Sequence, residues 1–238
     1  MKKLLTSLSI ILSIVFIALS SASALGQYES GTVGEDISWP NCTSRATPSG
    51  AFGIIGVSGG LVYSDNSCVA SEATYFKNVS LYANTGFNLN TTPGSYFEQA
   101  MAYGNCMTNN SCGAYWYGYL AGVHAAKYAQ SQGVSSPTWW LDVETGNTWN
   151  SNTSLNQQAL QGEYDGINAT VAPTTIGVYS TTSQWSSITG GWLNNWPVWY
   201  ATAVRKESQA IPYCKDTFTN GATFLVQFRG RLDQDYAC

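Results

Sequence analysis

Two carboxylates separated by a single residue, Asp142 and Glu144, stand in the segment Thr138-Trp-Trp-Leu-Asp-Val-Glu-Thr-Gly146. Successive side chains of a strand alternate between its two faces, so both acids point the same way, while Leu141 and Val143 point to the opposite side. Two carboxyls on one face can divide the acid–base work at a glycosidic bond, since one protonates the leaving oxygen and the other stabilises positive charge on the sugar. The same pattern could also be two solvated loop acids.

The residues and motifs of the sequence exclude several other kinds of catalytic site. His124 is the one histidine, which excludes a histidine-rich metal site and leaves a Ser-His-Asp triad one possible base. It falls in a helix predicted over residues 120–132, one turn before Tyr128, which favours a half-buried structural imidazole. The sequence has no G-x-S-x-G elbow, phosphate loop or dinucleotide fingerprint. Carboxylates remain as the candidate catalytic groups, and we expect no cofactor and no metal. A Ca²⁺ or Mg²⁺ site is the alternative interpretation of clustered acids, but the sequence lacks the spacing of a calcium-binding loop.

The N-terminal segment has the organisation of a secretory signal. Two lysines precede an almost wholly apolar stretch over residues 4–19, and Ala22-Ser23-Ala24 offers the small-x-small pattern that a signal peptidase cuts. We therefore expect residues 1–24 to be removed, residues 25–238 to form a single domain, and the protein to be secreted. The alternative is an uncleaved membrane anchor, because the apolar stretch approaches the length of a spanning helix.

The cysteines also indicate an oxidising, extracellular location. Their even number behind a signal predicts three disulfides, although the sequence alone leaves the pairing open. A zinc site would need closely paired Cys or Cys/His spacings, which are lacking. Oxidised thiols also exclude a thiolate nucleophile. Pairing of nearest neighbours is favoured, because each loop then pins one segment locally: Cys42 with Cys68, Cys106 with Cys112, and Cys214 with Cys238.

The charge balance excludes one class of partner. The chain has 10 basic and 14 acidic residues and a net charge of −4, with no run of Lys or Arg that could hold a phosphate backbone. We therefore expect no nucleic-acid partner. We also expect no stable membrane insertion once the signal is removed, and a monomer. Six N-x-S/T sequons fit a secreted chain, and they begin at Asn41, Asn78, Asn90, Asn109, Asn152 and Asn168.

The elements that must position the two acids alternate along the chain. A helix over residues 120–132 is predicted to end at Gly133 as a left-handed cap, and one over 155–169 to begin with Ser154 and Gln157 as a capping box. Strands alternating with helices predict an α/β fold, a (β/α) TIM-like barrel that is irregular in its last third, where the connections are too short for full helices. The carboxyl ends of barrel strands form the active face, and both acids stand at such an end. The eight predicted strands are Gly34–Ser38, Phe52–Val57, Val79–Ala83, Tyr115–Tyr119, Thr138–Glu144, Thr175–Ser180, Pro197–Thr202 and Thr223–Phe228.

Five landmarks follow one another along the chain: Gly34-Glu-Asp-Ile-Ser38, Trp140-Leu-Asp-Val-Glu144, Gly177-Val-Tyr-Ser180, Pro197-Val-Trp-Tyr-Ala201, and Val226-Gln-Phe228 with Leu232-Asp-Gln-Asp235. In this order they resemble the family-25 glycoside hydrolases, the lysozyme-like muramidases that cut peptidoglycan between N-acetylmuramic acid and N-acetylglucosamine. The resemblance covers most of the chain after the signal. The cysteines, the Trp39-Pro40-Asn41-Cys42 turn and the Tyr82-Ala-Asn84 strand end indicate a separate secreted branch.

The resemblance implies a barrel and gives roles to four acids. Glu144 would be the general acid/base, and Asp142 would stabilise the oxocarbenium-like state or orient the N-acetyl group of the substrate. Asp36 and Asp233 would complete the acidic floor. The closing motif reads Asp-Gln-Asp where the family has Asp-x-Asn, so Asp233 and Asp235 are alternatives for the last role. Four carboxyls around one cleft cannot all ionise cheaply, so we expect at least one raised pKa. Retention, inversion and participation of the acetamido group stay open.

Aromatic rings offer flat surfaces to sugar rings, and Tyr117, Tyr179 and Trp199 are predicted to reach one rim of the cleft. Gln227, in the motif of the closing strand, is the fourth candidate for substrate binding, whereas Trp139 is expected to fill the helix–sheet layer. We expect a secreted glycosidase that hydrolyses β-1,4 bonds of an N-acetylhexosamine-containing polysaccharide, peptidoglycan above all. The alternative is a catalytically silent barrel that binds cell-wall or surface glycan. The two differ in whether the general acid reaches a glycosidic oxygen in an open groove.

Overall fold

The computed structural model of the protein describes residues 28–43 and 47–238. The signal predicted over residues 1–24 lies outside the described residues. Within the described ranges, no helix is both long enough and apolar enough to cross a membrane.

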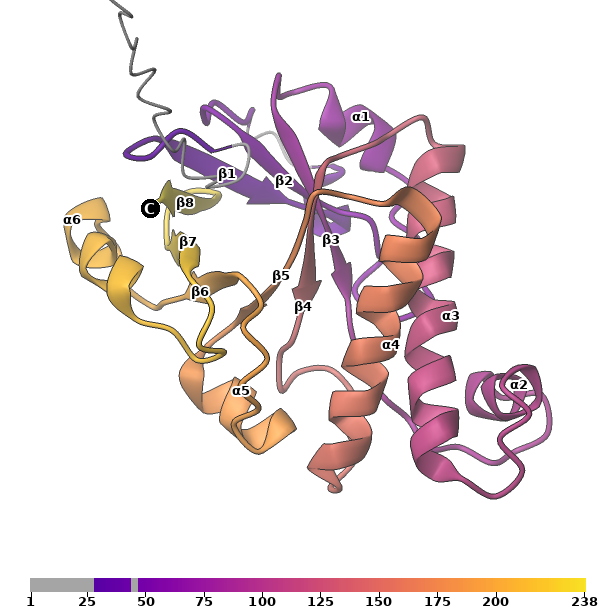
Figure 1. The fold of residues 1–238 in the computed structure, drawn as a ribbon. Helices are drawn as coiled ribbons and strands as arrows, with labels where there is room; N and C mark the ends of the chain where they lie inside the picture. Colours follow the sequence, from indigo (N-terminus) through magenta and orange to yellow (C-terminus); the bar gives the residue numbers. More distant parts are fainter. Residues whose placement is uncertain (1–27, 44–46) are drawn as a thin grey trace, which may run out of the picture.

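Eight strands close into a barrel in which neighbours along the chain are hydrogen-bonded neighbours in space (Figure 1). The strands from β1 to β7 run parallel, and β8 closes the ring by pairing antiparallel with both β7 and β1. The predicted α/β barrel is thereby confirmed. Seven of the eight predicted strands are present, but the remaining strand of the barrel is β8 and not the segment over residues 115–119. The strands are β1 (Val33–Ile37), β2 (Gly53–Gly56), β3 (Val79–Asn84), β4 (Thr138–Asp142), β5 (Thr175–Ser180), β6 (Val198–Ala201), β7 (Thr223–Phe228) and β8 (Asp233–Ala237).

The helices are unevenly distributed around the barrel. Two long ones, α3 and α4, stand side by side along it, and α2 packs outside α3 (Figure 1). After β5 the connections carry only short helices, so the predicted irregular last third is confirmed. The helices are α1 (Val69–Ala73), α2 (Tyr96–Tyr103), α3 (Asn110–Ser131), α4 (Thr153–Val171), α5 (Thr182–Thr189) and α6 (Glu207–Ala210), with the 3₁₀ helices η1 (Trp39–Asn41) and η2 (Ile211–Lys215).

The strand predicted over Tyr115–Tyr119 is wrong, because this segment lies in α3. The helix begins at a cap in which the side chain of Asn109 accepts a hydrogen bond from the backbone N–H of Cys112 at 3.1 Å. Aromatic residues favour strands by propensity, but Ala114 and Gly118 recur at helical spacing and are buried. Close packing of this small-residue face therefore overrides the local preference.

The two ends predicted for the long helices have different outcomes. Gly133, two residues after the end of α3, has a φ of +73°, which confirms the left-handed cap. The capping box predicted for Ser154 and Gln157 is wrong, because Asn152 caps α4 by accepting from the N–H of Ser154 at 3.1 Å. The side chain of Gln157 instead donates to the carbonyl of Thr189 at 2.6 Å and ties α4 to the end of α5.

Helices α3 and α4 pack with their backbones in close contact. A Cβ on Gly118 would lie 1.7 Å from the carbonyl oxygen of Ala159, and one on Gly162 would lie 1.9 Å from the carbonyl oxygen of Tyr115. Only glycine leaves room at these two positions. Because α3 and α4 share a buried cluster with β4, this tight pair forms the wall behind the strand that carries the two acids.

Two adjacent tryptophans on β4 separate the two core layers. Trp139 faces the layer between strands and helices, as predicted, and Trp140 faces the barrel interior. The ring of Trp140 occupies space that Gly177 of β5 leaves free, since a Cβ there would lie 2.4 Å from a ring carbon. The buried hydrophobic residues of the barrel interior are Tyr28, Phe52, Ile54, Trp140, Trp199, Leu225 and Ala237.

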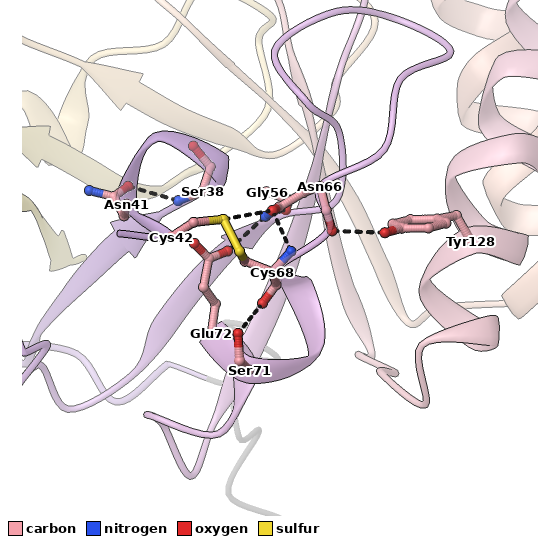
Figure 2. Close-up of a disulfide and its surroundings, with 9 residues drawn as sticks. All are labelled: Ser38, Asn41, Cys42, Gly56, Asn66, Cys68, Ser71, Glu72 and Tyr128. Carbon is pink, nitrogen blue, oxygen red and sulfur yellow. Dashed lines mark hydrogen bonds between the residues drawn. A yellow bond between two sulfur atoms is a disulfide. The ribbon is translucent and has the colours of Figure 1, made fainter. Parts of the chain in front are cut away.

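Three disulfides join the predicted nearest-neighbour pairs, and no cysteine is free. The Cys42–Cys68 bond connects η1 to the start of α1 (Figure 2). Beside it, the side-chain amide of Asn66 donates to the carbonyl of Gly56 and to the carboxylate of Glu72, both at 2.7 Å. The disulfide and this amide therefore fasten the η1 turn to the end of β2 and to α1.

Candidate active site

The carboxyl ends of the parallel strands open into a cleft of about 380 Å³. Strand β8 runs the other way, so its first residue, Asp233, lies at this same end, opposite Asp36 of β1 in the strand register. Active sites of parallel barrels are built at this end. The cleft is lined by Asp36, Ser38, Pro40, Asn41, Tyr82, Asp142, Glu144, Tyr179, Trp199, Gln227, Arg231, Leu232 and Asp233.

The two central acids share one face, as the period-two pattern predicts. Asp142 and Glu144 line the cleft, whereas Leu141 and Val143 are fully buried on the other face. The carboxyl groups of Asp142 and Glu144 are hydrogen-bonded to each other. Asn84, at the end of β3, donates its side-chain N–H to Asp142 Oδ2. Asp142 is thus held from two sides and is only 5 % exposed.

Glu144 is oriented by a glutamine from α5, the helix that follows β5. The backbone N–H of Thr145 donates to Gln184 Oε1 at 2.6 Å, and the Thr145 hydroxyl donates to the same oxygen at 2.9 Å. With its oxygen occupied, the Gln184 amide turns its N–H₂ group to the Glu144 carboxyl, to which it is hydrogen-bonded. Helix α5 is therefore part of the site, because it fixes the direction of this carboxyl.

Burial makes both central carboxyls weaker acids. Desolvation raises the pKa of Asp142 well above its usual range, and the neighbouring charge of Glu144 raises it further. Desolvation also raises the pKa of Glu144, against the hydrogen bonds from Gln184 and Asp142, which lower it. Because the two titrations are coupled, the pair as a whole keeps a proton to a higher pH than a free carboxyl does. A retained proton is what a general acid needs.

Two further acids lie on the opposite wall. Burial raises the pKa of Asp36 to about 7, with a further contribution from the charge of Asp233. Gln227 donates from Nε2 to Asp36 Oδ2 at 2.9 Å. Asp233 is more exposed, and its pKa is raised by burial and lowered by the charge of Arg229.

The alternatives for the closing acid occupy different depths. Asp233 lines the cleft, whereas Asp235 is completely buried beneath it, in the barrel interior. The indole N–H of Trp199 donates to Asp235 Oδ1 at 2.7 Å. The structure thus brings Asp36, Asp142, Glu144 and Asp233 together around one cleft, with Asp235 under its floor.

The predicted substrate-binding residues divide into two groups. Tyr179, Trp199 and Gln227 line the cleft, and the Tyr179 hydroxyl donates to Gln227 Oε1 at 2.8 Å. Tyr117 does not reach the cleft: it is buried on α3 among Phe87 and other aromatic residues, so its predicted place on the rim is wrong. The physical reason is the helix itself, which turns this residue into the packing layer instead of toward a strand end.

His124 is also away from the cleft. It lies half-buried on α3, as predicted, with Nε2 2.9 Å from Asp65 Oδ1. Among the side chains that contact the acids, sequence reasoning missed Asn84 and Gln184. The period-two pattern of Tyr82-Ala-Asn84 could have placed Tyr82 and Asn84 together at a strand end. Nothing in the sequence indicates that Gln184, from a helix, reaches a loop after β4.

Comparison with known sequences points to one family. The family model described as Lysozyme-like protein 1 matches residues 54–220. The probable GH family 25 lysozyme 4 of Dictyostelium discoideum is 32% identical over 99 residues, which cover 41% of this chain and 41% of that protein. The probable GH family 25 lysozyme 5 of the same organism is 35% identical over 65 residues, or 26% of this chain and 30% of that protein. The chain therefore matches less than half the length of these relatives.

Two solved structures share the fold. A muramidase from Trichobolus zukalii superposes with a TM-score of 0.50 over 87% of this chain and 93% of that one, at 14% identity. A glycosyl hydrolase 25 virulence factor of Streptococcus pneumoniae superposes with a TM-score of 0.52 over 87% of each chain, also at 14% identity. At this identity the likeness is one of fold.

Proposed function

Because the chain belongs to the lysozyme-like protein 1 family, we propose that it is a secreted glycoside hydrolase that cleaves β-1,4 bonds of an N-acetylhexosamine polymer, with peptidoglycan as the substrate. The observation that carries this proposal is the contact between the carboxyls of Asp142 and Glu144 on the face of an open cleft. The three disulfides support secretion. We further propose that the protein acts as a monomer.

In the proposed reaction, Glu144 gives to the glycosidic oxygen the proton that it shares with Asp142 through their hydrogen bond. Two touching carboxyls hold one proton between them at near-neutral pH, because both cannot ionise cheaply in a desolvated place. When that proton moves to the leaving oxygen, the pair gains a negative charge at the moment the sugar becomes positive. The buried carboxyl of Asp142, which Asn84 holds, is the group that stabilises this developing cation or orients the acetamido group.

The contact between the two carboxyls also bears on stereochemistry. Retention through a protein nucleophile needs carboxyls roughly 5–5.5 Å apart, and inversion needs them further apart, on opposite sides of the bond. Asp142 and Glu144, which are hydrogen-bonded to each other, do not by themselves meet either requirement. This supports participation of the substrate's own acetamido group, with the pair acting from one side.

The walls of the cleft support a sugar ligand of mixed character. Tyr179 offers an aromatic face and a hydroxyl, and Gln227 an amide, which suits pyranose rings with polar edges. Arg231 is the one cation among the residues that line the cleft. A guanidinium at the rim suits carboxylates such as those carried by the lactyl and peptide groups of peptidoglycan.

The proposal is tested by incubating purified protein with peptidoglycan and with chitin oligomers, across acidic to neutral pH, and measuring new reducing ends. We expect peptidoglycan to be cut by the native protein and by Glu207→Gln, a matched change at an exposed glutamate of α6, but far less by Glu144→Gln. If the native protein releases no ends yet still binds the polymer in a pull-down, the silent glycan-binding barrel replaces the enzyme.

A further inference from the structure

One carboxyl oxygen of Asp235 is buried and has no hydrogen-bond donor among the described residues, which is unfavourable if Asp235 is an ionised carboxylate. The residue is 0% exposed, and its Oδ1 accepts the indole N–H of Trp199 at 2.7 Å. Its Oδ2 is buried and receives no hydrogen bond from any donor of the described chain. The side chain beside it is Asp36, with which it is hydrogen-bonded only if one of the two carries a proton. Two buried carboxylates in contact would repel each other strongly.

The surrounding donors determine where that proton must be. An indole N–H can only donate, so Oδ1 of Asp235 is an acceptor and a proton on Asp235 belongs to Oδ2. Tyr179 donates to Gln227 Oε1, which leaves Gln227 Nε2 to donate to Asp36 Oδ2 at 2.9 Å. Asp36 Oδ2 is thus an acceptor, and it receives its hydrogen bond from Gln227. A proton on Asp235 Oδ2, directed at Asp36, satisfies both carboxyls.

We propose that Asp235 is a positioning residue that stays protonated and donates its Oδ2 proton to Asp36, thereby holding the Asp36 carboxylate in the floor of the cleft. Its effect on cleavage rests on the proposed function, but its protonation does not. Desolvation raises the pKa of Asp235 well above its usual range, and the charge of Asp36 adds to this, which agrees with the geometry. One proton on this pair also halves the charge that lies beneath the central acids.

The groups that face Asp235 leave no other way to neutralise it. They are Asp36 from β1, Asp233 from β8 itself, and the Tyr179 phenol from β5, whose pKa the Asp235 charge helps to raise. None of these groups within the described ranges is a cation. When the proton is finally lost at high pH, the pair carries two charges and Asp36 loses a donor.

The first test measures thermal unfolding of native protein, Asp235→Asn and the exposed control Asp216→Asn from about pH 4 to about pH 8. An asparagine keeps an oxygen for Trp199 and an N–H for Asp36 but cannot ionise. We expect the Tm of Asp235→Asn, relative to native protein, to rise steadily with pH, while that of Asp216→Asn does not. A difference that is constant with pH, or that falls with pH, would overturn the proposal, since Asp235 would then be ionised in the folded protein.

The second test follows cleavage. Asp235→Leu, which removes both hydrogen bonds, should lower kcat/KM on peptidoglycan by about 10²-fold, the cost of misplacing a group in the site. Asp235→Asn should restore the rate to within a few-fold and extend activity to more alkaline pH than the native protein tolerates. An asparagine variant with the native alkaline limit would overturn the positioning role. If the native protein cuts nothing, the proposed function fails, and the thermal test still decides the protonation of Asp235.

Discussion

The roles proposed for Asp142 and Glu144 can be separated experimentally, because in the proposed reaction only Glu144 gives a proton to the leaving group. Glu144→Gln keeps the shape and the hydrogen bonds of the side chain but not its acidity, so cleavage of peptidoglycan should fall by about 10²–10⁴-fold. On an aryl glycoside whose leaving group needs no proton, Glu144→Gln should regain much of its rate. Asp142→Asn should stay slow on both substrates, since the developing cation is still unsupported.

The measurement is the release of the aryl group compared with the release of reducing ends, for both variants under identical conditions. The control is native protein, whose rate should increase much less than that of Glu144→Gln when the aryl glycoside replaces peptidoglycan. Equal behaviour of the two variants on the two substrates would mean that the roles assigned to these carboxyls are wrong.

At the level of single residues, the sequence predicts which acids line the cleft but not the side chains that hydrogen-bond to them, Asn84 and Gln184. Alternation along one strand was enough to put Asp142 and Glu144 on a common face, away from Leu141 and Val143. The hydrogen bond from Gln184 depends on the distance between α5 and the loop after β4, and no local sequence pattern predicts this distance.

At the level of elements, the glycine contact between α3 and α4 gives a direct test. A methyl group at Gly162 would lie 1.9 Å from a carbonyl oxygen of α3, so Gly162→Ala must push the helices apart. We expect the free energy of unfolding to fall by about 1–3 kcal/mol, as for other overpacked cores. Urea unfolding checks this, with Gly146→Ala as the control, because a Cβ at Gly146 meets nothing within 4 Å. Equal stability of the Gly162→Ala variant and the native protein would contradict the close packing.

Two elements could not be predicted from local sequence, for opposite reasons. The segment over 115–119 has the aromatic composition of a strand, but its small neighbours pack it as a helix against α4. Strand β8 has two aspartates in five residues, a composition that strands avoid, because its inward positions serve the cleft. Tertiary packing decides the first case and the chemistry of the site decides the second.

At the level of the whole molecule, the raised pKa values of its acids predict an unusual dependence of stability on pH. Burial raises the pKa of Asp36 to about 7 and also raises those of Asp142, Glu144, Asp233 and Asp235. Between the usual carboxyl pKa of about 4 and these higher values, the folded state binds more protons than the unfolded state. The free energy of unfolding therefore falls as pH rises through this window.

We expect the Tm to be highest in mildly acidic buffer and to fall steadily toward about pH 8, in scans at constant ionic strength. The net charge of −4 at pH 7 adds self-repulsion in the same direction. A Tm that rises from acidic to neutral pH would mean that these carboxyls are ionised and stabilised in the folded protein, against the burial described above.

The closure of the barrel by an antiparallel last strand has a consequence in time. Asp36 lies on the first strand and Asp233 on the last, yet the two face each other in register. A nascent chain that has emerged only as far as β7 already contains Asp142 and Glu144. Its sheet is still open, because the edges of β1 and β7 have no strand to pair with. Strand β8 follows β7 in the chain, and it supplies both the strand that covers these two edges and the carboxyl of Asp233. The cleft is therefore complete only once β8 has been synthesised and has paired with β1 and β7, so a ribosome-bound chain that ends before Asp233 holds only part of the acidic site.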